Sequence, residues 1–398
     1  MTALGKLAPG APPKAGFIPL SVPELQGNEW AYVKECLDTG WVSSAGAFVE
    51  QFERSVADAI GARHAVATVN GTAALHVALL VAGVRPDDEV LVSTLTFIAP
   101  ANAIRYVGAW PVFIDAEPDY WQMDVGKALD FLERQCEWRA GGLYNRVTGR
   151  RVRAVIPVHI LGHPVDLEPL RDACSKYRLS LIEDATESLG AAYRGTRVGH
   201  LGDVACFSFN GNKLITTGGG GMLVTDDAAL AHRARYLTTQ AKDDSIEYVH
   251  GAVGYNYRLT NIQAALGVAQ MERLSAYIAA KRRIAGIYDR ALGAIPGITS
   301  MREAPWAESV WWMYTVLVDE AQFGIDSREL LRRLERDRIQ TRPLWQPLHR
   351  SLPHAGAFAT DCSVADRLNR DALSLPCSVG LEAAAQNRVI EQIGAQRP

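Results

Sequence analysis

Lys213 lies in a short polar turn between two apolar runs, Val204–Phe209 and Gly221–Thr225, and four consecutive glycines follow it at 218–221. Such a turn suits an amine that forms an imine with an aldehyde, because the glycines leave the backbone approachable. The attacking amine must be neutral, and a desolvated site lowers the pKa of an amine. Because the lysine comes before the glycines, the segment is not a P-loop, in which the glycines precede the lysine. It is not a dinucleotide-binding fingerprint either, because no helix begins at the glycines.

Asp184 ends another apolar run, Leu179–Asp184, and small and polar residues follow it. In open α/β sheets, ligands bind at the carboxyl ends of the strands. A carboxylate at this place can pair with a protonated pyridine nitrogen, which keeps the ring able to accept electrons from a developing carbanion. By itself, an aspartate at the end of a strand is more often a helix cap or a turn residue.

Two turns have the residue types that bind phosphate. Gly71, Thr72 and Ala73 would present free N–H groups and a hydroxyl at a helix N-terminus, which is a ready anion site. An ordinary N-capped helix explains these three residues equally well. Ser208 and Asn210 are polar residues at the end of a strand and are able to bond a phosphate.

Two other segments have polar or aromatic side chains next to regular elements. Phe97 follows a strand-like run and could stack on a flat ring, although an isolated phenylalanine is more commonly a core residue. The turn Gly254–Arg258 precedes a long helical pattern. Its Asn256 and Arg258 could be ligands, and a loop at the start of a helix explains them just as well.

Short apolar runs that alternate with helical patterns must position these residues. Most of the runs are rich in Val, Ile, Leu and Phe, as strands buried on both faces should be. We expect helices between them, for example at Thr72–Ala82 and Leu167–Tyr177. This alternation predicts an α/β domain with a mostly parallel sheet. The seven predicted strands are Ala65–Val69, Glu89–Ser93, Pro111–Asp115, Arg153–His159, Leu179–Asp184, Val204–Phe209 and Gly221–Thr225.

The pattern changes after residue 258, where a long, alanine-rich and mostly helical stretch begins. A chain of 398 residues exceeds the roughly 250–300 that one core supports. We therefore predict a flexible tail over 1–17, a large domain over 18–258, and a linking helix with a smaller α+β domain over 259–398. The predicted C-terminal elements are helices at Leu259–Leu292, Ser327–Arg338 and Leu381–Ile393 and a strand at Met313–Val318.

The stretch 134–153 contains six arginines and three glycines and interrupts the alternation of strands and helices. It predicts a solvated surface loop. The alternative is a loop that helps to hold phosphates of a substrate or contacts a partner subunit.

Composition narrows the class of protein. The formal net charge of −3 gives no basic field for nucleic acid, and no apolar run reaches the roughly 20 residues that span a bilayer. The N-terminus has no apolar segment typical of a secretory signal. The six cysteines lie far apart without a CxxC pair, which argues against a zinc site or a disulfide framework. We expect a cytoplasmic protein without a metal site.

In their order along the chain, these segments resemble the DegT/DnrJ/EryC1/StrS family of sugar aminotransferases, within the aspartate-aminotransferase fold type I. The resemblance extends from about Ile18 to Ile393. It implies a pyridoxal-5′-phosphate (PLP) enzyme with a seven-stranded sheet in its large domain, and a homodimer with active sites at the subunit interface. The matching segments are Gly40–Gly46 with Phe52-Glu53, Asn70–Leu75, Gly108–Asp115, Val158–Gly162, Glu183–Ala185, Ser208–Lys213, Gly254–Arg258 and Pro347–His349.

The resemblance also implies residue roles. Lys213 would form the Schiff base and shuttle a proton, Asp184 would pair with the pyridine nitrogen, and Phe97 would stack on the ring. Glu187 occupies a position near the ring hydroxyl that is Gln, His or Glu in the family, where a carboxylate changes the local hydrogen bonding. Further cofactor contacts are implied for Gly71, Thr72, Ala73, Ser208, Asn210 and, from the neighbouring subunit, Asn256. Substrate contacts are implied for Ser43, Ser44, Lys242, Arg342 and His349.

The implied reaction has two halves. Glutamate gives its amine to PLP, and the resulting pyridoxamine phosphate condenses with a ketone on a nucleotide-linked sugar, with Lys213 as general acid and base. Some relatives are PLP-dependent sugar dehydratases, in which histidine replaces this lysine, so lysine favours transamination. A regulatory paralogue would have lost Lys213 or Asp184, and a nicotinamide enzyme would need a strand–GxGxxG–helix unit.

Finer resemblance concerns the sugar. The segments Phe207–Met222 and Tyr236–Asp243 and the insert ending at Thr148–Val152 are similar to enzymes of the legionaminic acid pathway. This similarity implies that the amine goes to C4 of a UDP-linked 2-acetamido-2,6-dideoxy-4-keto-hexose. The alternative within the family is a GDP-linked 4-keto-6-deoxymannose, as in perosamine synthesis.

Overall fold

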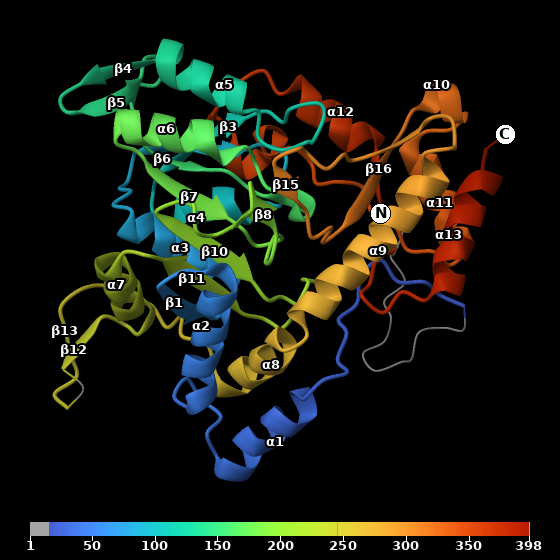
Figure 1. The fold of residues 1–398 in the computed structure, drawn as a ribbon. Helices are drawn as coiled ribbons and strands as arrows, with labels where there is room; N and C mark the ends of the chain where they lie inside the picture. The colour runs from blue at the N-terminus through green and yellow to red at the C-terminus, as the bar shows by residue number, and fades with distance from the viewer. Residues whose placement is uncertain (1–15, 245, 398) are drawn as a thin grey trace.

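A large, mostly parallel sheet forms the centre of the fold (Figure 1). The protein is represented by a computed structural model, which describes residues 16–244 and 246–397. Within these residues the sheet has ten strands, eight of them in the order β1-β11-β10-β7-β6-β2-β3-β17. All seven predicted strands are present: β1 His64–Thr68, β2 Glu89–Ser93, β3 Trp110–Ile114, β6 Arg151–Ile156, β7 Ser180–Asp184, β10 Val204–Ser208 and β11 Gly221–Thr225.

The direction of the strands places the polar turns at one edge of this sheet. Strands β10, β7, β6, β2 and β3 are parallel neighbours, and β11 is antiparallel to both β10 and β1. The short strand β17, Phe358–Ala359, pairs in parallel with β3 and lies at the end of the order. The carboxyl ends of the parallel strands therefore meet at the edge where Asp184 ends β7 and Ser208 ends β10.

The arginine-rich insert is a hairpin and not the predicted loop. It consists of β4, Cys136–Arg139, and β5, Gly142–Asn145, and β5 extends the sheet by pairing with the start of β6. The buried carboxylate of Glu89 holds it, accepting hydrogen bonds from the Asn145 amide at 2.9 Å and the Thr148 hydroxyl at 2.7 Å. Because β6 and β10 run in the same direction, the hairpin lies at the amino edge, away from the turn that follows β10 in the same chain.

Helices cover the sheet, and several match the prediction closely. Helix α6 has the predicted bounds, and α3 starts one residue before the predicted helix. Helix α3 packs on β10 and β11, whereas α2 and α7 contact β1. The helices of this part are α1 Glu29–Thr39, α2 Ala47–Ile60, α3 Gly71–Val81, α4 Ala99–Tyr106, α5 Val125–Asp130, α6 Leu167–Tyr177 and α7 Ala228–Thr238. A small three-stranded sheet consists of β8 Ala192–Tyr193, β9 Thr196–Arg197 and β15 Ala307–Glu308. A separate pair of strands consists of β12 Lys242–Asp244 and β13 Val249–His250.

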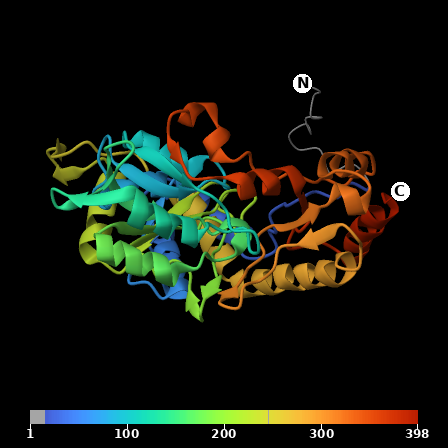
Figure 2. The same ribbon diagram turned by 90° about the horizontal axis from the view of Figure 1, so that it is seen from above.

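The predicted long helix is two helices, α8 Asn261–Met271 and α9 Leu274–Leu292. Thr260 begins α8 with a capping box, in which its hydroxyl and the side chain of Gln263 satisfy each other's backbone N–H groups. The chain leaves helical geometry only briefly between the helices, and neither glycine nor proline marks the break. Figure 2 shows α9 running from the large sheet along the C-terminal part of the molecule.

A three-stranded antiparallel sheet organises the C-terminal part, with α9, α11 and α13 close to it. Ile18 and Leu20 also lie here, since Ile18 bridges to Ile339 and the Leu20 N–H donates to the Gln340 side chain at 3.0 Å. The predicted domain boundary at residue 258 stays a prediction, and residues 1–15 of the predicted tail are outside the described residues. The elements are β14 Ile298–Ser300, β16 Tyr314–Val318, β18 Ala372–Leu375, α10 Glu320–Phe323, α11 Ser327–Arg336, α12 Ser363–Asp371 and α13 Ala383–Ala395.

Two classes of feature are absent from the described residues. None of the helices within them combines the length and the apolar character needed to cross a bilayer. The His, Cys, Asp and Glu side chains in these ranges form no group of three or more that could hold a metal ion.

Candidate active site

A cavity of about 480 Å³ opens at the carboxyl ends of β7 and β10. Lys213 and Asp184, 29 positions apart in the sequence, both line it, as the prediction requires. The predicted site residues that line this cavity are Gly71, Thr72, Phe97, Asp184, Glu187, Ser208, Asn210 and Lys213.

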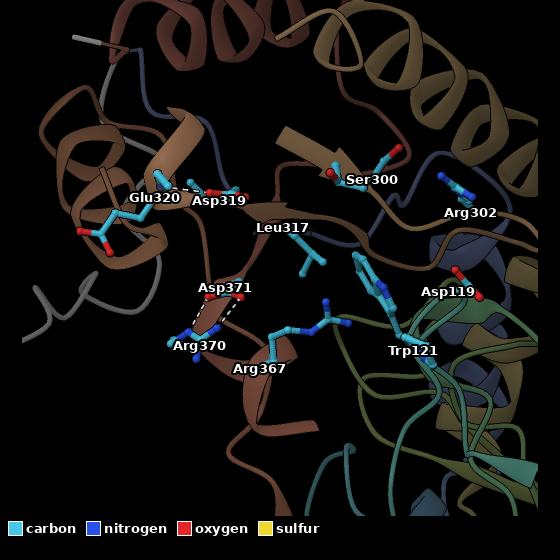
Figure 3. Close-up of a pocket in the computed structure, with 14 residues that line it drawn as sticks. Asp119, Trp121, Ser300, Arg302, Leu317, Asp319, Glu320, Arg367, Arg370 and Asp371 are labelled. Carbon is cyan, nitrogen blue, oxygen red and sulfur yellow. Dashed lines mark hydrogen bonds and ion pairs between the residues drawn. The ribbon is translucent and has the colours of Figure 1, made fainter. Parts of the chain in front are cut away.

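A larger cavity, of about 630 Å³, lies elsewhere, between the loop before α5 and the elements β14, β16 and α12. Figure 3 shows Arg367 and Trp121 pointing into it. None of the predicted site residues lines this cavity. The candidate site is therefore not the larger of the two cavities but the one on which the predicted side chains converge.

The turn after β10 holds Lys213 between an acid and an aromatic ring. The Lys213 N–H donates to the Asn210 carbonyl at 3.0 Å, which closes the turn. Its Nζ lies 3.4 Å from Glu187 Oε1 and 4.2 Å from the centre of the Trp312 ring. The lysine side chain is only 14% exposed, so the amine is held in a largely enclosed place.

Asp184 is a buried carboxylate without a cationic partner. Its Oδ1 accepts the Thr186 N–H at 3.2 Å, and among the described residues no Lys, Arg or His nitrogen lies within ion-pair distance of it. Burial raises the pKa of Asp184, and the hydrogen bonds from Thr186 and the charge of Lys213 act in the opposite direction. A buried carboxylate of this kind is stabilised by a cation placed against it, such as a protonated ring nitrogen.

Glu187 lies between Lys213 and a strained piece of backbone. Its Oε2 accepts the Leu161 N–H at 2.8 Å, and Leu161 has a left-handed backbone with φ of 60° that aims this N–H at the carboxylate. Burial raises the pKa of Glu187, whereas the charge of Lys213 and the Leu161 N–H lower it. Glu187 is thus fixed on one oxygen and faces the lysine amine with the other.

Helix α3 begins at the cavity with a predicted anion site. Gly71 and Thr72 line the cavity at the helix N-terminus, where the first N–H groups have no intrahelical partners. A Cβ on Gly71 would lie 2.8 Å from the Ser208 Cβ, so glycine is required for this close approach. The prediction of a free N–H at Ala73 is wrong, because this N–H donates to the Asn70 side chain at 2.8 Å.

These features fit PLP. The glycine-lined helix start with Ser208 suits a phosphate, the buried Asp184 suits a ring cation, and the Lys213 amine lies in the same cavity. Phe97 lines the cavity with 57% of its surface exposed, which leaves its ring free to stack as predicted.

Several predicted residues do not converge on Lys213 within this chain. Asn256 is exposed and bridges through its backbone to Thr239, so its assignment to the neighbouring subunit's cofactor stays a prediction. Arg258 pairs with the buried Glu53 at 3.0 Å, which identifies it as a structural residue of the loop before α8. The predicted substrate residues outside the cavity lining are Ser43, Ser44, Lys242, Arg342 and His349.

The surroundings of these substrate residues differ. Ser43 and Ser44 are exposed in the loop after α1, and Lys242 is exposed on a hairpin. Arg342 is exposed and donates to the carbonyl of the residue before it. His349 is held in place, with Nδ1 2.9 Å from the hydroxyl of Thr94, in the turn after β2. Their contact with substrate stays a prediction.

The sequence reasoning missed residues that the fold brings to the cavity from far along the chain. Trp312 and Trp345 line it, although both lie beyond residue 258. Asn212 and Thr186 also line it, beside the predicted lysine and aspartate. The adjacent pair Trp311-Trp312 was the available sign, since two consecutive tryptophans are unusual in a loop before a strand.

Comparisons with known proteins agree with this geometry. The chain is 40% identical over 374 residues to the GDP-perosamine synthase of Caulobacter vibrioides, covering 94% of this chain and 96% of that protein. It is 37% identical to the GDP-perosamine synthase of Escherichia coli O157:H7, covering 90% and 93% of the two chains.

Solved structures show the same fold. The aminotransferase TlmJ from Streptoalloteichus hindustanus superposes with a TM-score of 0.86 at 28% identity, covering 95% of this chain and 98% of that one. DesV of S. venezuelae gives 0.83 at 31% identity, covering 92% and 94%. The model of the DegT/DnrJ/EryC1/StrS aminotransferase family matches residues 23–394. The chain therefore belongs to this family of PLP-dependent sugar aminotransferases.

Proposed function

We propose that this enzyme transfers an amino group from glutamate to C4 of a GDP-linked 4-keto-6-deoxymannose. The observation that carries the proposal is the 40% identity to a GDP-perosamine synthase over 94% of the chain. A second GDP-perosamine synthase, at 37% identity, supports the same nucleotide. These relatives favour the GDP-linked alternative over the UDP-linked sugar that the finer sequence resemblance suggested.

The side chains of the cavity have distinct tasks in this reaction. PLP supplies an electron sink that stabilises negative charge on the carbon losing a proton. The neutral Lys213 amine accepts that proton and becomes an ammonium. It then donates the proton to a second carbon and is a neutral amine again. Glu187, 3.4 Å away, is placed to hold the ammonium between the two transfers. Asp184 would hold the ring nitrogen, and Gly71 with Ser208 the phosphate.

We also propose that the active form is a homodimer with shared sites. Several large apolar side chains that are exposed in the single chain support this, because an interface would bury them. Trp30, Leu37 and Trp41 of α1 and the following loop are 78%, 58% and 59% exposed, and Val253 in the loop before Asn256 is 81% exposed. Sedimentation of the pure enzyme is expected to give twice the chain mass, and a fully active monomer would contradict the shared site.

The six cysteines support the proposed cytoplasmic location. All six lie within the described residues, and each is buried and free. Buried, unpaired thiols are usual where the surroundings are reducing.

The substrate assignment is tested by comparing two sugar nucleotides with glutamate in excess. We expect kcat/KM for the GDP-linked 4-keto-6-deoxymannose to exceed that for the UDP-linked N-acetylated 4-keto sugar by at least ~100-fold, because a site that hydrogen-bonds one base and sugar leaves polar groups unpaired against the other. The product is identified by mass, which separates an added amine from a dehydration. Preference for the UDP-linked sugar would overturn the assignment, while bleaching of the visible band by glutamate alone would still report the first half-reaction.

A further inference from the structure

Trp312 covers one side of the Lys213 amine and also holds the backbone beneath it. The centre of its ring is 4.2 Å from Lys213 Nζ. Its indole N–H donates to the Asn212 carbonyl at 2.8 Å, one residue before the lysine. One side chain therefore fixes both the turn that carries Lys213 and the end of its side chain.

Trp312 is itself firmly held. Lys281 of α9 is buried and donates from Nζ to the Trp312 carbonyl at 2.8 Å and to the Cys377 carbonyl at 2.5 Å. On the other side, a Cβ on Gly162 would lie 2.8 Å from the Trp312 nitrogen, and the Val310 N–H donates to the Gly162 carbonyl at 3.0 Å. Because its backbone is packed between two elements and only 5% of the residue is exposed, Trp312 has little room to move.

The same packing joins both sides of the lysine. Gly162 follows Leu161, whose N–H donates to Oε2 of Glu187. The other oxygen of this carboxylate, Oε1, faces the Lys213 amine. The loop of Trp312 and the loop of Leu161 are hydrogen-bonded to each other. The acid and the aromatic ring that contact the lysine therefore belong to one packed unit.

We propose that Trp312 is a positioning residue that orients Lys213 and stabilises its ammonium form while it carries the proton. The face of an indole attracts a nearby cation, and the attraction is stronger where water is largely excluded. A fixed amine also reaches each carbon without a search through other rotamers. This inference rests on the proposed proton transfer by Lys213 and is independent of which nucleotide the sugar carries.

The test uses the PLP-loaded variants Trp312→Leu and Trp312→Phe. The first removes the ring face and the indole N–H, and the second keeps a ring but loses the N–H. Trp306→Phe is the matched control, since Trp306 does not line the cavity and its buried indole nitrogen has no partner among the described atoms. Two quantities are measured against pH: the stopped-flow rate with glutamate alone, and the visible absorption of the resting enzyme, which does not depend on turnover.

We expect Trp312→Leu to slow the glutamate reaction at least ~10-fold with little change in the glutamate KM. The alkaline limb of its rate profile and the midpoint of its visible band should both move to lower pH, because the cation loses a stabilising neighbour. Trp312→Phe should lose roughly 3-fold in rate and shift the pH profile less than Trp312→Leu does, because phenylalanine is a weaker partner for a cation than tryptophan. The control should match the wild type.

A Trp312→Leu enzyme that binds PLP fully and retains the wild-type rate and pH profile would overturn the proposal. If that variant does not fold, Trp312→Phe decides, because a rate and a pH profile equal to those of the wild type and of Trp306→Phe would overturn both proposed roles of Trp312. Since only glutamate is used, a wrong sugar assignment leaves this experiment unaffected. A wild-type enzyme that does not react with glutamate would instead refute the proposed aminotransfer itself.

Discussion

Replacing Lys213 with alanine is expected to lower the rate of amino transfer by at least roughly 10³-fold. The substitution removes the amine that would bind the cofactor covalently and, with it, the group that would carry the proton. Lys213 is the lysine that lines the cavity, so within the described structure no second lysine is placed to replace it. The rate is measured by stopped-flow absorbance with glutamate, and the yellow colour of the purified variant reports the cofactor linkage.

A matched variant separates the chemistry from the charge. Lys213→Arg keeps a cation between Glu187 and Trp312, but a guanidinium neither forms an imine nor gives up its proton. We expect it to be as inactive as Lys213→Ala and to unfold at a temperature closer to that of the wild type. Turnover by either variant at more than about a tenth of the wild-type rate would remove Lys213 from the mechanism.

Replacing Asp184 with asparagine is expected to lower kcat/KM by about 10²–10³-fold and to weaken PLP binding. The amide keeps the size and can still accept the Thr186 N–H, but it has no charge to hold a proton on the ring nitrogen. Without that proton the ring is a poorer acceptor of electrons. Equilibrium dialysis of PLP and the steady-state rates measure the two effects separately.

The stability of the cofactor-free protein gives an independent test at the same position. Burial raises the pKa of Asp184, so its charged form is disfavoured when no cation faces it. Removing the charge should therefore leave the free energy of unfolding of the apoenzyme unchanged or slightly higher. Asp203→Asn, the same substitution at an exposed aspartate outside the cavity, is the control for the change from Asp to Asn itself. A large loss of apoenzyme stability specific to Asp184→Asn would show that the carboxylate serves the fold instead.

Most strands of the large sheet were readable from the sequence because they are buried on both faces and are therefore largely apolar runs. Strand β2, for example, is buried at every position. The β4–β5 hairpin has no such apolar run. It is held by hydrogen bonds that its Asn145 and the following Thr148 donate to Glu89, which is distant in sequence. The break between α8 and α9 was missed for a similar reason, because its local sequence is compatible with a continuous helix.

The candidate site was predictable where one short segment supplies the chemistry. Lys213, Asp184 and the start of α3 each lie at the end of a strand, and parallel strands bring such ends together. Trp312 could not be found this way, since it reaches the cavity only through the packing of a loop from the C-terminal part. The prediction of a free N–H at Ala73 was wrong because the cap residue Asn70, three positions earlier, accepts a hydrogen bond from it.

Because β17 pairs with β3 at the end of the sheet, part of β3 stays unpaired for much of the synthesis of the chain. Strand β3 is apolar, and its free edge at Val112 and Phe113 would be paired only when Phe358 and Ala359 arrive. During synthesis, more than 240 residues follow β3 before that happens. Until then the nascent protein carries a bare strand edge, the kind of surface on which unfinished chains adhere to one another. Pairing of β17 with β3, and not folding of the strands that precede it, would cover this part of the edge.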